Sequence, residues 1–253
     1  MSPTSARPPD VRRFDDAAAL VRAAADELLA VADEAVRVRG VFWLVLAGGR
    51  TPRALYERLA EVGPAAAVPW HRWQVWFGDE RMVAPDHPDS NLRMAREAWL
   101  ARVPLPATQV HAVPTEPPDP IAAAAAYEAT IRRVTGAKPP GIPVFDLVLL
   151  GMGEDGHTAS LFPGSLLLEE RVRLAAAVRK APKPPPDRVT LTLPLFWAAR
   201  HVRFLVTGAD KAGVLGRILA GESFARALPA ARVAAGAFDV AWYVDAGASG
   251  PRG

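Results

Sequence analysis

Residues 41–63, VFWLVLAGGRTPRALYERLAEVG, decide the fold class of this chain. The segment begins with an apolar run of strand length that ends in Gly48 and Gly49. A run so rich in β-branched and aromatic residues is typical of a strand buried on both faces. Thr51 is a candidate N-cap, and Pro52 suits the first position of a helix. The sequence therefore predicts a strand, a glycine turn and a helix over residues 41–62.

The same order of elements recurs on both sides of this segment. Residues 15–39 carry apolar side chains at helical spacing and predict a long amphipathic helix. Further strands are predicted at 73–80, 109–113, 145–153, 173–178, 188–199, 202–208 and 240–248, and further helices at 90–103, 119–134 and 209–221. Such alternation predicts an α/β fold with a mostly parallel sheet flanked by helices.

Composition and charge limit the possible functions. The chain has 253 residues, and 50% hydrophobic residues supply ample material for a core. Its net charge of +3 comes from dispersed basic residues, which argues against a nucleic-acid partner. The absence of cysteine excludes disulfides and thiolate chemistry. Neither a signal-peptide core nor a run of 18 apolar residues is present, so we expect a cytoplasmic protein without a membrane partner.

No break in composition divides the chain. We therefore expect a single domain over residues 13–247, with disordered tails at 1–12 and 248–253 that have little to bury. The proline-rich segment at 180–187 is expected to be a surface loop.

Ligands bind at the carboxyl ends of strands in sheets of this kind, and two strand ends carry anion-compatible residues. At the first, Gly48, Gly49, Arg50 and Thr51 predict a backbone cradle for phosphate, unless they form an ordinary tight turn. At the second, Asp79, Glu80 and Arg81 follow an apolar strand and either face the cleft or form a solvated loop.

A third strand end, GMGEDGHTASLFPG at 151–164, places His157 beside Glu154 and Asp155. A short helix is predicted at 157–162, whose N-terminus disfavours the imidazolium while the two carboxylates favour it. A histidine balanced in this way exchanges protons near pH 7. A structural histidine is the competing interpretation. A metal site is disfavoured, because one imidazole beside two acids lacks the spacing of a zinc site. Four other histidines are expected to be structural or exposed, namely His71, His87, His111 and His201.

Taken together, these segments resemble the 6-phosphogluconolactonase family. The resemblance rests on AGGRTPRALYERLA, WFGDERMVAPDHPDSNLRMAREAWL, FDLVLLGMGEDGHTASLFPG, RVTLTLP and TGADKAGVL, and spans about residues 41–215. It implies the Rossmann-like fold that this family shares with glucosamine-6-phosphate deaminase and ribose-5-phosphate isomerase. The continuation TASLFPG is similar to the lactonases, whereas deaminases typically have IAFNEPG. Ala47 and Arg50 depart from the family, where serines are common.

The resemblance also implies roles for individual residues. His157 is expected to be the general base in hydrolysis of 6-phospho-D-glucono-1,5-lactone, with Glu154 or Asp155 orienting it. Arg81 and Lys211 are expected to bind the phosphate together with residues 48–51, while Asp79, Asn91 and Arg188 line the site. No metal or organic cofactor is expected, and the chain is expected to be a monomer.

Two alternatives remain open from the sequence. The first is a sugar-phosphate aminohydrolase or isomerase of the same fold, with Asp79 as the proton-transferring carboxylate. The second is a non-catalytic sugar-phosphate sensor. A DNA-binding sensor needs a helix-turn-helix, and the sequence before Val41 has room for only one long helix.

Overall fold

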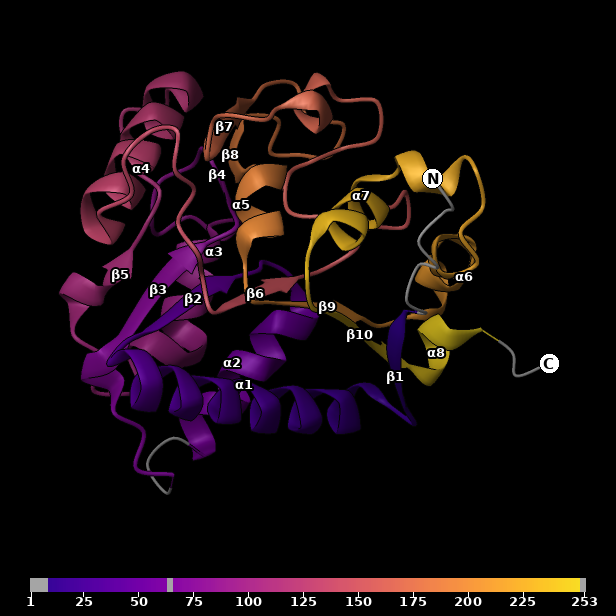
Figure 1. The fold of residues 1–253 in the computed structure, drawn as a ribbon, viewed down its shortest axis with the longest axis horizontal. Coiled ribbons are helices and arrows are strands. Elements are labelled where there is room, and N and C mark those ends of the chain that lie inside the picture. The colour runs from indigo at the N-terminus through magenta and orange to yellow at the C-terminus, as the bar shows by residue number, and fades with distance from the viewer. Residues whose placement is uncertain (1–8, 63–65, 251–253) are drawn as a thin grey trace, which may run out of the picture.

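A computed structural model describes residues 9–62 and 66–250 of the chain, which centre on a parallel sheet (Figure 1). Across the described residues the sheet has seven strands in the order β1-β10-β9-β6-β2-β3-β5, and all of its pairings are parallel. The strands are β1 (Asp10–Phe14), β10 (Val240–Asp245), β9 (His201–Val206), β6 (Leu147–Leu150), β2 (Phe42–Leu46), β3 (Trp73–Phe77) and β5 (Val110–His111). The predicted α/β fold with a mostly parallel sheet is confirmed.

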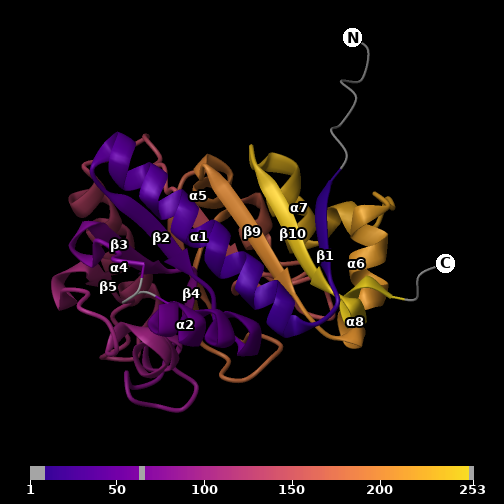
Figure 2. The ribbon, with the colours of Figure 1, turned by 90° about the horizontal axis from the view of Figure 1, so that it is seen from below.

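Helices cover both faces of this sheet. One face carries α1 (Ala17–Arg39) and α2 (Arg50–Val62), and Figure 2 shows α1 crossing several strands. The other face carries α4 (Pro120–Thr135), α5 (Leu193–Ala198) and α7 (Pro229–Gly236). In the described residues, the remaining α-helices are α3 (Asn91–Ala95), which continues as a π-helical turn (Arg96–Leu100), α6 (Ala212–Leu219) and α8 (Ala246–Ser249). No helix in the described part of the chain is long and apolar enough to span a bilayer.

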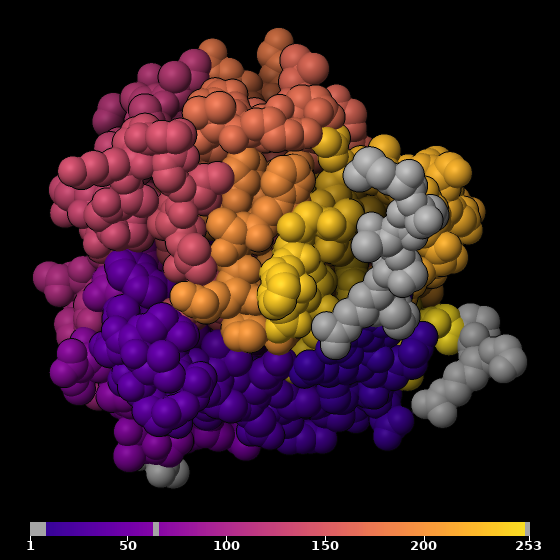
Figure 3. Space-filling view, viewed as in Figure 1, coloured from indigo at the N-terminus to yellow at the C-terminus, as the bar shows by residue number. Residues whose placement is uncertain are grey.

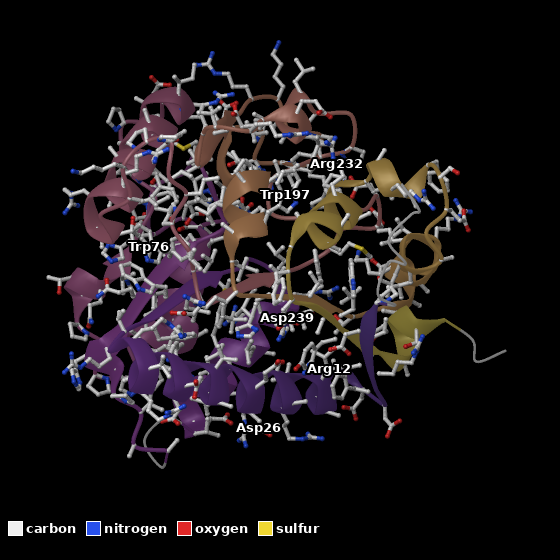
Figure 4. The ribbon with its side chains drawn as sticks, in the orientation of Figure 1. Arg12, Asp26, Trp76, Trp197, Arg232 and Asp239 are labelled. Atoms are coloured by element: carbon white, nitrogen blue, oxygen red, sulfur yellow. The ribbon has the colours of Figure 1, made fainter. Side chains whose placement is uncertain are left out.

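Two apolar layers form because alternate side chains of each central strand point to opposite faces. In β2, Leu44 and Leu46 pack with α1 and α2, whereas Val45 faces the second layer. Trp76 of β3, labelled in Figure 4, joins that second layer. Its ring centroid lies 6.0 Å from that of Tyr127 in α4. These continuous apolar strands hold the carboxyl edge of the sheet in a fixed position.

A smaller antiparallel sheet corrects two sequence predictions. It contains β4 (Asp79–Arg81), β8 (Arg188–Leu191) and β7 (Ala175–Val178). The strand predicted at 73–80 divides at Gly78, whose N–H donates to Leu46 O at 2.9 Å and whose carbonyl accepts from Leu191 N at 2.8 Å. The strand predicted at 188–199 ends early, because Pro194 stands at the start of α5.

The predicted tails are also partly wrong. Residues 10–12 belong to β1, which pairs with β10 and whose Arg12 contacts Glu27 and Tyr243. Residues 248 and 249 belong to α8, where Ala248 is buried. Residues 1–8 and 251–253 lie outside the described part of the chain. Figure 3 shows how closely the first helix and the last elements of the chain adjoin on one surface.

Candidate active site

A cavity of about 260 Å³ opens at the carboxyl ends of β2, β3 and β6. From β2 the chain continues to β3 on one side, while β6 pairs with β2 on the other side. Ligands of open α/β sheets bind at such a switch point. Of the described residues, six titratable ones line the cavity, namely Asp79, Arg81, His157, Lys183, Arg188 and Lys211. The cavity is therefore strongly cationic.

His157 lies in this cavity in contact with one carboxylate. Its Nδ1 is 2.5 Å from Asp155 Oδ1, and its backbone N–H donates to the same oxygen at 3.2 Å. Partial burial raises the pKa of Asp155, but the hydrogen bond to His157 and the electrostatic interaction with it outweigh burial and leave this pKa below its usual value. The ring of Phe162 lies against the imidazole with centroids 4.9 Å apart. Asp155 is thus an ionised partner that orients the imidazole.

The loop that carries His157 depends on a glycine and contains no helix. A Cβ on Gly153 would lie 2.0 Å from His157 Nδ1, so only glycine leaves room for the ring. Thr158 donates its hydroxyl to Gly151 O, and its backbone pairs with Leu161 in a tight turn. The predicted helix at 157–162 is therefore wrong, and with it the expected influence of a helix N-terminus on His157.

Glu154 faces a different partner. Its Oε1 accepts from Lys183 Nζ at 3.1 Å, and its side chain is 60% exposed. The sequence left open which of the two acids orients the imidazole, and the structure brings only Asp155 into contact with His157.

The glycine loop after β2 forms another part of the cavity lining. Gly48 and Gly49 line it, whereas Arg50 is exposed and absent from the lining among the described residues. Thr51 lies inside α2 rather than at its N-cap, and its hydroxyl is 2.7 Å from that of Thr207. A Cβ on Gly48 would lie 2.2 Å from Asn91 Oδ1, so this loop requires close approach of backbone and side chain.

Asp79 and Arg188 belong to a buried polar network below the cavity. Asp79 Oδ2 accepts from Ser160 Oγ at 2.6 Å, and Arg188 Nη1 donates to the same hydroxyl at 3.3 Å. Asn91 Nδ2 donates to the carbonyl of Asp79 at 2.9 Å. Burial lowers the pKa of Arg188 and outweighs the attraction of Asp79. The network holds Asp79 with one side toward the cavity.

The two predicted phosphate cations approach the cavity from different elements. Arg81 of β4 donates Nη1 to Asp89 O at 2.9 Å, while its buried Nε has no partner among the described residues. Lys211 follows β9 and contacts Asp210 at 2.5 Å. Both side chains line the cavity, so each can bring a positive charge to an anionic ligand there.

Sequence reasoning missed Glu80 as a positioning residue. Its buried carboxylate accepts from the backbone N–H groups of Arg81, Asn91 and Leu92, each at 2.8 Å. Burial raises its pKa and outweighs these bonds. The carboxylate holds the chain so that Asn91 reaches Gly48. The local sequence contains no signal for this, because a buried and a solvated acid after a strand have the same pattern.

Lys183 was also missed as a residue of the cavity, because its proline-rich segment resembles an ordinary surface loop.

Of the other histidines, none lines the cavity in the described residues. His111 stacks on Trp76, and burial lowers its pKa to about 4. His201 contacts Asp239, while His71 and His87 lie near the surface. Across the described residues, no group of three or more acidic or histidine side chains is placed to hold a metal ion.

Comparisons with known proteins show which family this chain resembles. A family model for glucosamine-6-phosphate isomerases/6-phosphogluconolactonase matches residues 15–242. A 6-phosphogluconolactonase of Nostoc sp. is 42% identical over 238 residues, covering 94% of this chain and 96% of the relative. A human 6-phosphogluconolactonase is 43% identical over 213 residues, covering 83% of this chain and 81% of the relative.

Solved structures show the same similarity. A 6-phosphogluconolactonase from Leishmania guyanensis is 30% identical with a TM-score of 0.84, covering 96% of this chain and 98% of the solved one. A monomeric glucosamine-6-phosphate deaminase is 20% identical with a TM-score of 0.80, covering 96% of this chain and 100% of the solved one. At 20% identity, the similarity to the deaminase shows only that the two chains share a fold.

Proposed function

This chain belongs to the glucosamine-6-phosphate isomerase/6-phosphogluconolactonase family, and from that membership we propose that it hydrolyses 6-phospho-D-glucono-1,5-lactone to 6-phosphogluconate in the pentose phosphate pathway. The observation that carries the proposal is the His157–Asp155 pair in a cationic cavity at the sheet's switch point. A general base can activate water for attack on an ester, and the positive charges of the cavity attract the phosphate group of the substrate.

His157 is the general base of the proposed reaction. With Asp155 accepting at Nδ1, that nitrogen carries the proton and Nε2 is free to accept one from water. The water oxygen bonds to C1, and the carbonyl electron pair moves onto its oxygen. Collapse of this tetrahedral intermediate breaks the C1–O5 bond, and the ring oxygen takes the proton from the imidazolium. The base is thereby regenerated.

The phosphate anchors the substrate at the glycine loop after β2. Backbone N–H groups around Gly48 and Gly49 and the start of α2 favour an anion, aided by the helix dipole. Arg81 contributes a guanidinium group, and Lys211 contributes an ammonium group. Serine hydroxyls are replaced here by Ala47 and Arg50, so the cradle depends on backbone donors.

Loss of a phosphate cation is expected to weaken substrate binding more than chemistry. We expect Lys211→Ala and Arg81→Ala each to raise KM for the lactone by about 10-fold or more, with a smaller change in kcat, since the phosphate is remote from C1. Arg217→Ala is the matched control, because this arginine is exposed on α6. Unchanged kinetic constants for either variant would remove that residue from the phosphate site.

The related aminohydrolase activity is the alternative that Asp79 supports, because this carboxylate lines the cavity. We expect the wild-type protein to hydrolyse the lactone well above the spontaneous rate and to release no ammonia from glucosamine 6-phosphate. A pH-stat measures the first reaction, and an ammonia assay measures the second. Ammonia release without lactone hydrolysis would reverse the assignment. Absence of both activities would favour a sugar-phosphate sensor.

We further propose that the active unit is a monomer.

A further inference from the structure

Lys183 approaches the cavity from the segment between β7 and β8 and has no role in the reaction described above. We propose that its ammonium group binds the negative charge that develops at C1, first on the carbonyl oxygen and then on the product carboxylate. Glu154 is its partner before substrate arrives. This inference rests on the proposed lactonase function.

The backbone around Lys183 is fixed to the floor of the cavity. Arg188 donates Nη2 to Lys183 O at 2.9 Å and to Pro184 O at 3.1 Å, and Nε to Pro185 O at 2.9 Å. Arg188 is 4% exposed and lines the same cavity. The loop also closes on itself through Ala181 N and Pro186 O, 2.8 Å apart. Lys183 thus extends from a fixed support.

The contacts of Lys183 place it near Asp155 and the proposed general base His157. Its Nζ pairs with Glu154, the residue next to Asp155. Its positive charge also contributes to the lowered pKa of Asp155, after the larger contributions of burial and His157. Lys211, by contrast, contacts Asp210 beyond the end of β9. The two lysines therefore serve different parts of one ligand, with Lys183 beside the general base.

Lys183 can readily exchange its partner Glu154 for a ligand. The side chains are 60% and 39% exposed, and exposed ion pairs contribute little to stability. The flexible lysine stem lets Nζ move from Glu154 toward the cavity without moving the loop. An oxyanion in the cavity is better shielded from water than Glu154 and therefore attracts the ammonium more strongly.

The inference predicts selectivity for a negative charge at C1. 6-Phosphogluconate and glucitol 6-phosphate both carry a phosphate on an open six-carbon chain, but only the first has a carboxylate at C1. Titration calorimetry is expected to show that the wild-type protein prefers 6-phosphogluconate by about 10-fold or more, as expected for a charge-assisted hydrogen bond. Lys183→Met should abolish this preference and leave affinity for glucitol 6-phosphate within about twofold.

Lys180→Met is the matched control, because Lys180 is an exposed lysine of the same loop and does not line the cavity among the described residues. It should keep the wild-type preference, and Lys183→Arg should keep most of it. Thermal melting monitored by circular dichroism checks that each variant is folded. If folded Lys183→Met still prefers 6-phosphogluconate as the wild type does, the inference is wrong.

Kinetics separate this inference from the proposed function. The bound lactone carries no negative charge at C1, so the contact with Lys183 strengthens as charge develops in the transition state. Lys183→Met should therefore lower kcat about 10- to 100-fold with a smaller change in KM. This pattern is opposite to that expected for Lys211→Ala. A wild-type protein that does not hydrolyse the lactone would overturn the proposed function itself. An active wild type with an equally active Lys183→Met would overturn only the role of Lys183.

Discussion

Replacement of His157 by alanine is expected to lower kcat by about 10²- to 10⁴-fold, the usual contribution of a positioned general base. Water is a weak nucleophile toward an ester carbonyl, and in the described cavity the imidazole is the group that an ionised carboxylate holds in place. Binding of 6-phosphogluconate should remain within about threefold, because the cationic side chains of the cavity are untouched. Initial rates from a pH-stat, with the spontaneous rate subtracted, measure the first effect, and calorimetry measures the second.

The matched control for this variant is His71→Ala. His71 is exposed in a turn before β3, at the opposite edge of the sheet from the cavity. Its replacement should leave kcat and KM unchanged. Turnover of His157→Ala close to that of the wild type would exclude this histidine as the base.

Asp155→Asn is expected to have the second largest effect, a fall in kcat of about 10²- to 10³-fold. The asparagine keeps the size of the side chain but removes the negative charge that stabilises the imidazolium during proton transfer. Its amide group also permits the wrong imidazole tautomer, with Nδ1 as acceptor and the proton on Nε2. KM should change little, since Asp155 contacts His157 and not the residues proposed to bind the phosphate.

The pH profile gives an independent readout of the same substitution. The pKa of Asp155 lies below its usual value, so this carboxylate is already ionised wherever imidazoles titrate. Without it the imidazolium loses a neighbouring negative charge, and the acidic limb of kcat/KM should move to lower pH. The depressed pKa also means that the contact of Asp155 with His157 stabilises the fold above the usual aspartate pKa. This contribution is lost as pH falls through the pKa of Asp155 in the folded state.

Glu154→Gln provides the comparison. Glu154 pairs with Lys183 and does not contact the imidazole, so its neutralisation should change kcat less than Asp155→Asn does and leave the acidic limb in place. A larger effect at Glu154 than at Asp155 would reverse the assignment of the orienting carboxylate.

The sequence alone predicted the elements whose patterns are local. The apolar run at 42–46, its glycine turn and the helix that follows all have the predicted type. Gly48, Asp79 and Gly153 line one cavity, which is one of the two interpretations that the sequence left open at Gly48 and at Asp79. The carboxyl ends of parallel strands share one edge of the sheet. Periodicity and turn residues are properties of neighbouring positions, and so they are readable without the fold.

Only the tertiary structure decided which side chains meet. Glu154 and Asp155 are adjacent acids in the sequence, yet one contacts Lys183 and the other His157. Strand β1 exists because β10, more than 200 residues away, offers an edge for Asp10–Phe14. The local sequence does not indicate that Glu80 and Lys183 belong to the site. Glu80 is held by a hydrogen bond from Asn91 N, and the loop of Lys183 is held by Arg188. Desolvation and hydrogen bonding are set by elements distant in the chain, and these interactions determine which carboxylate orients a base and which remains at the surface.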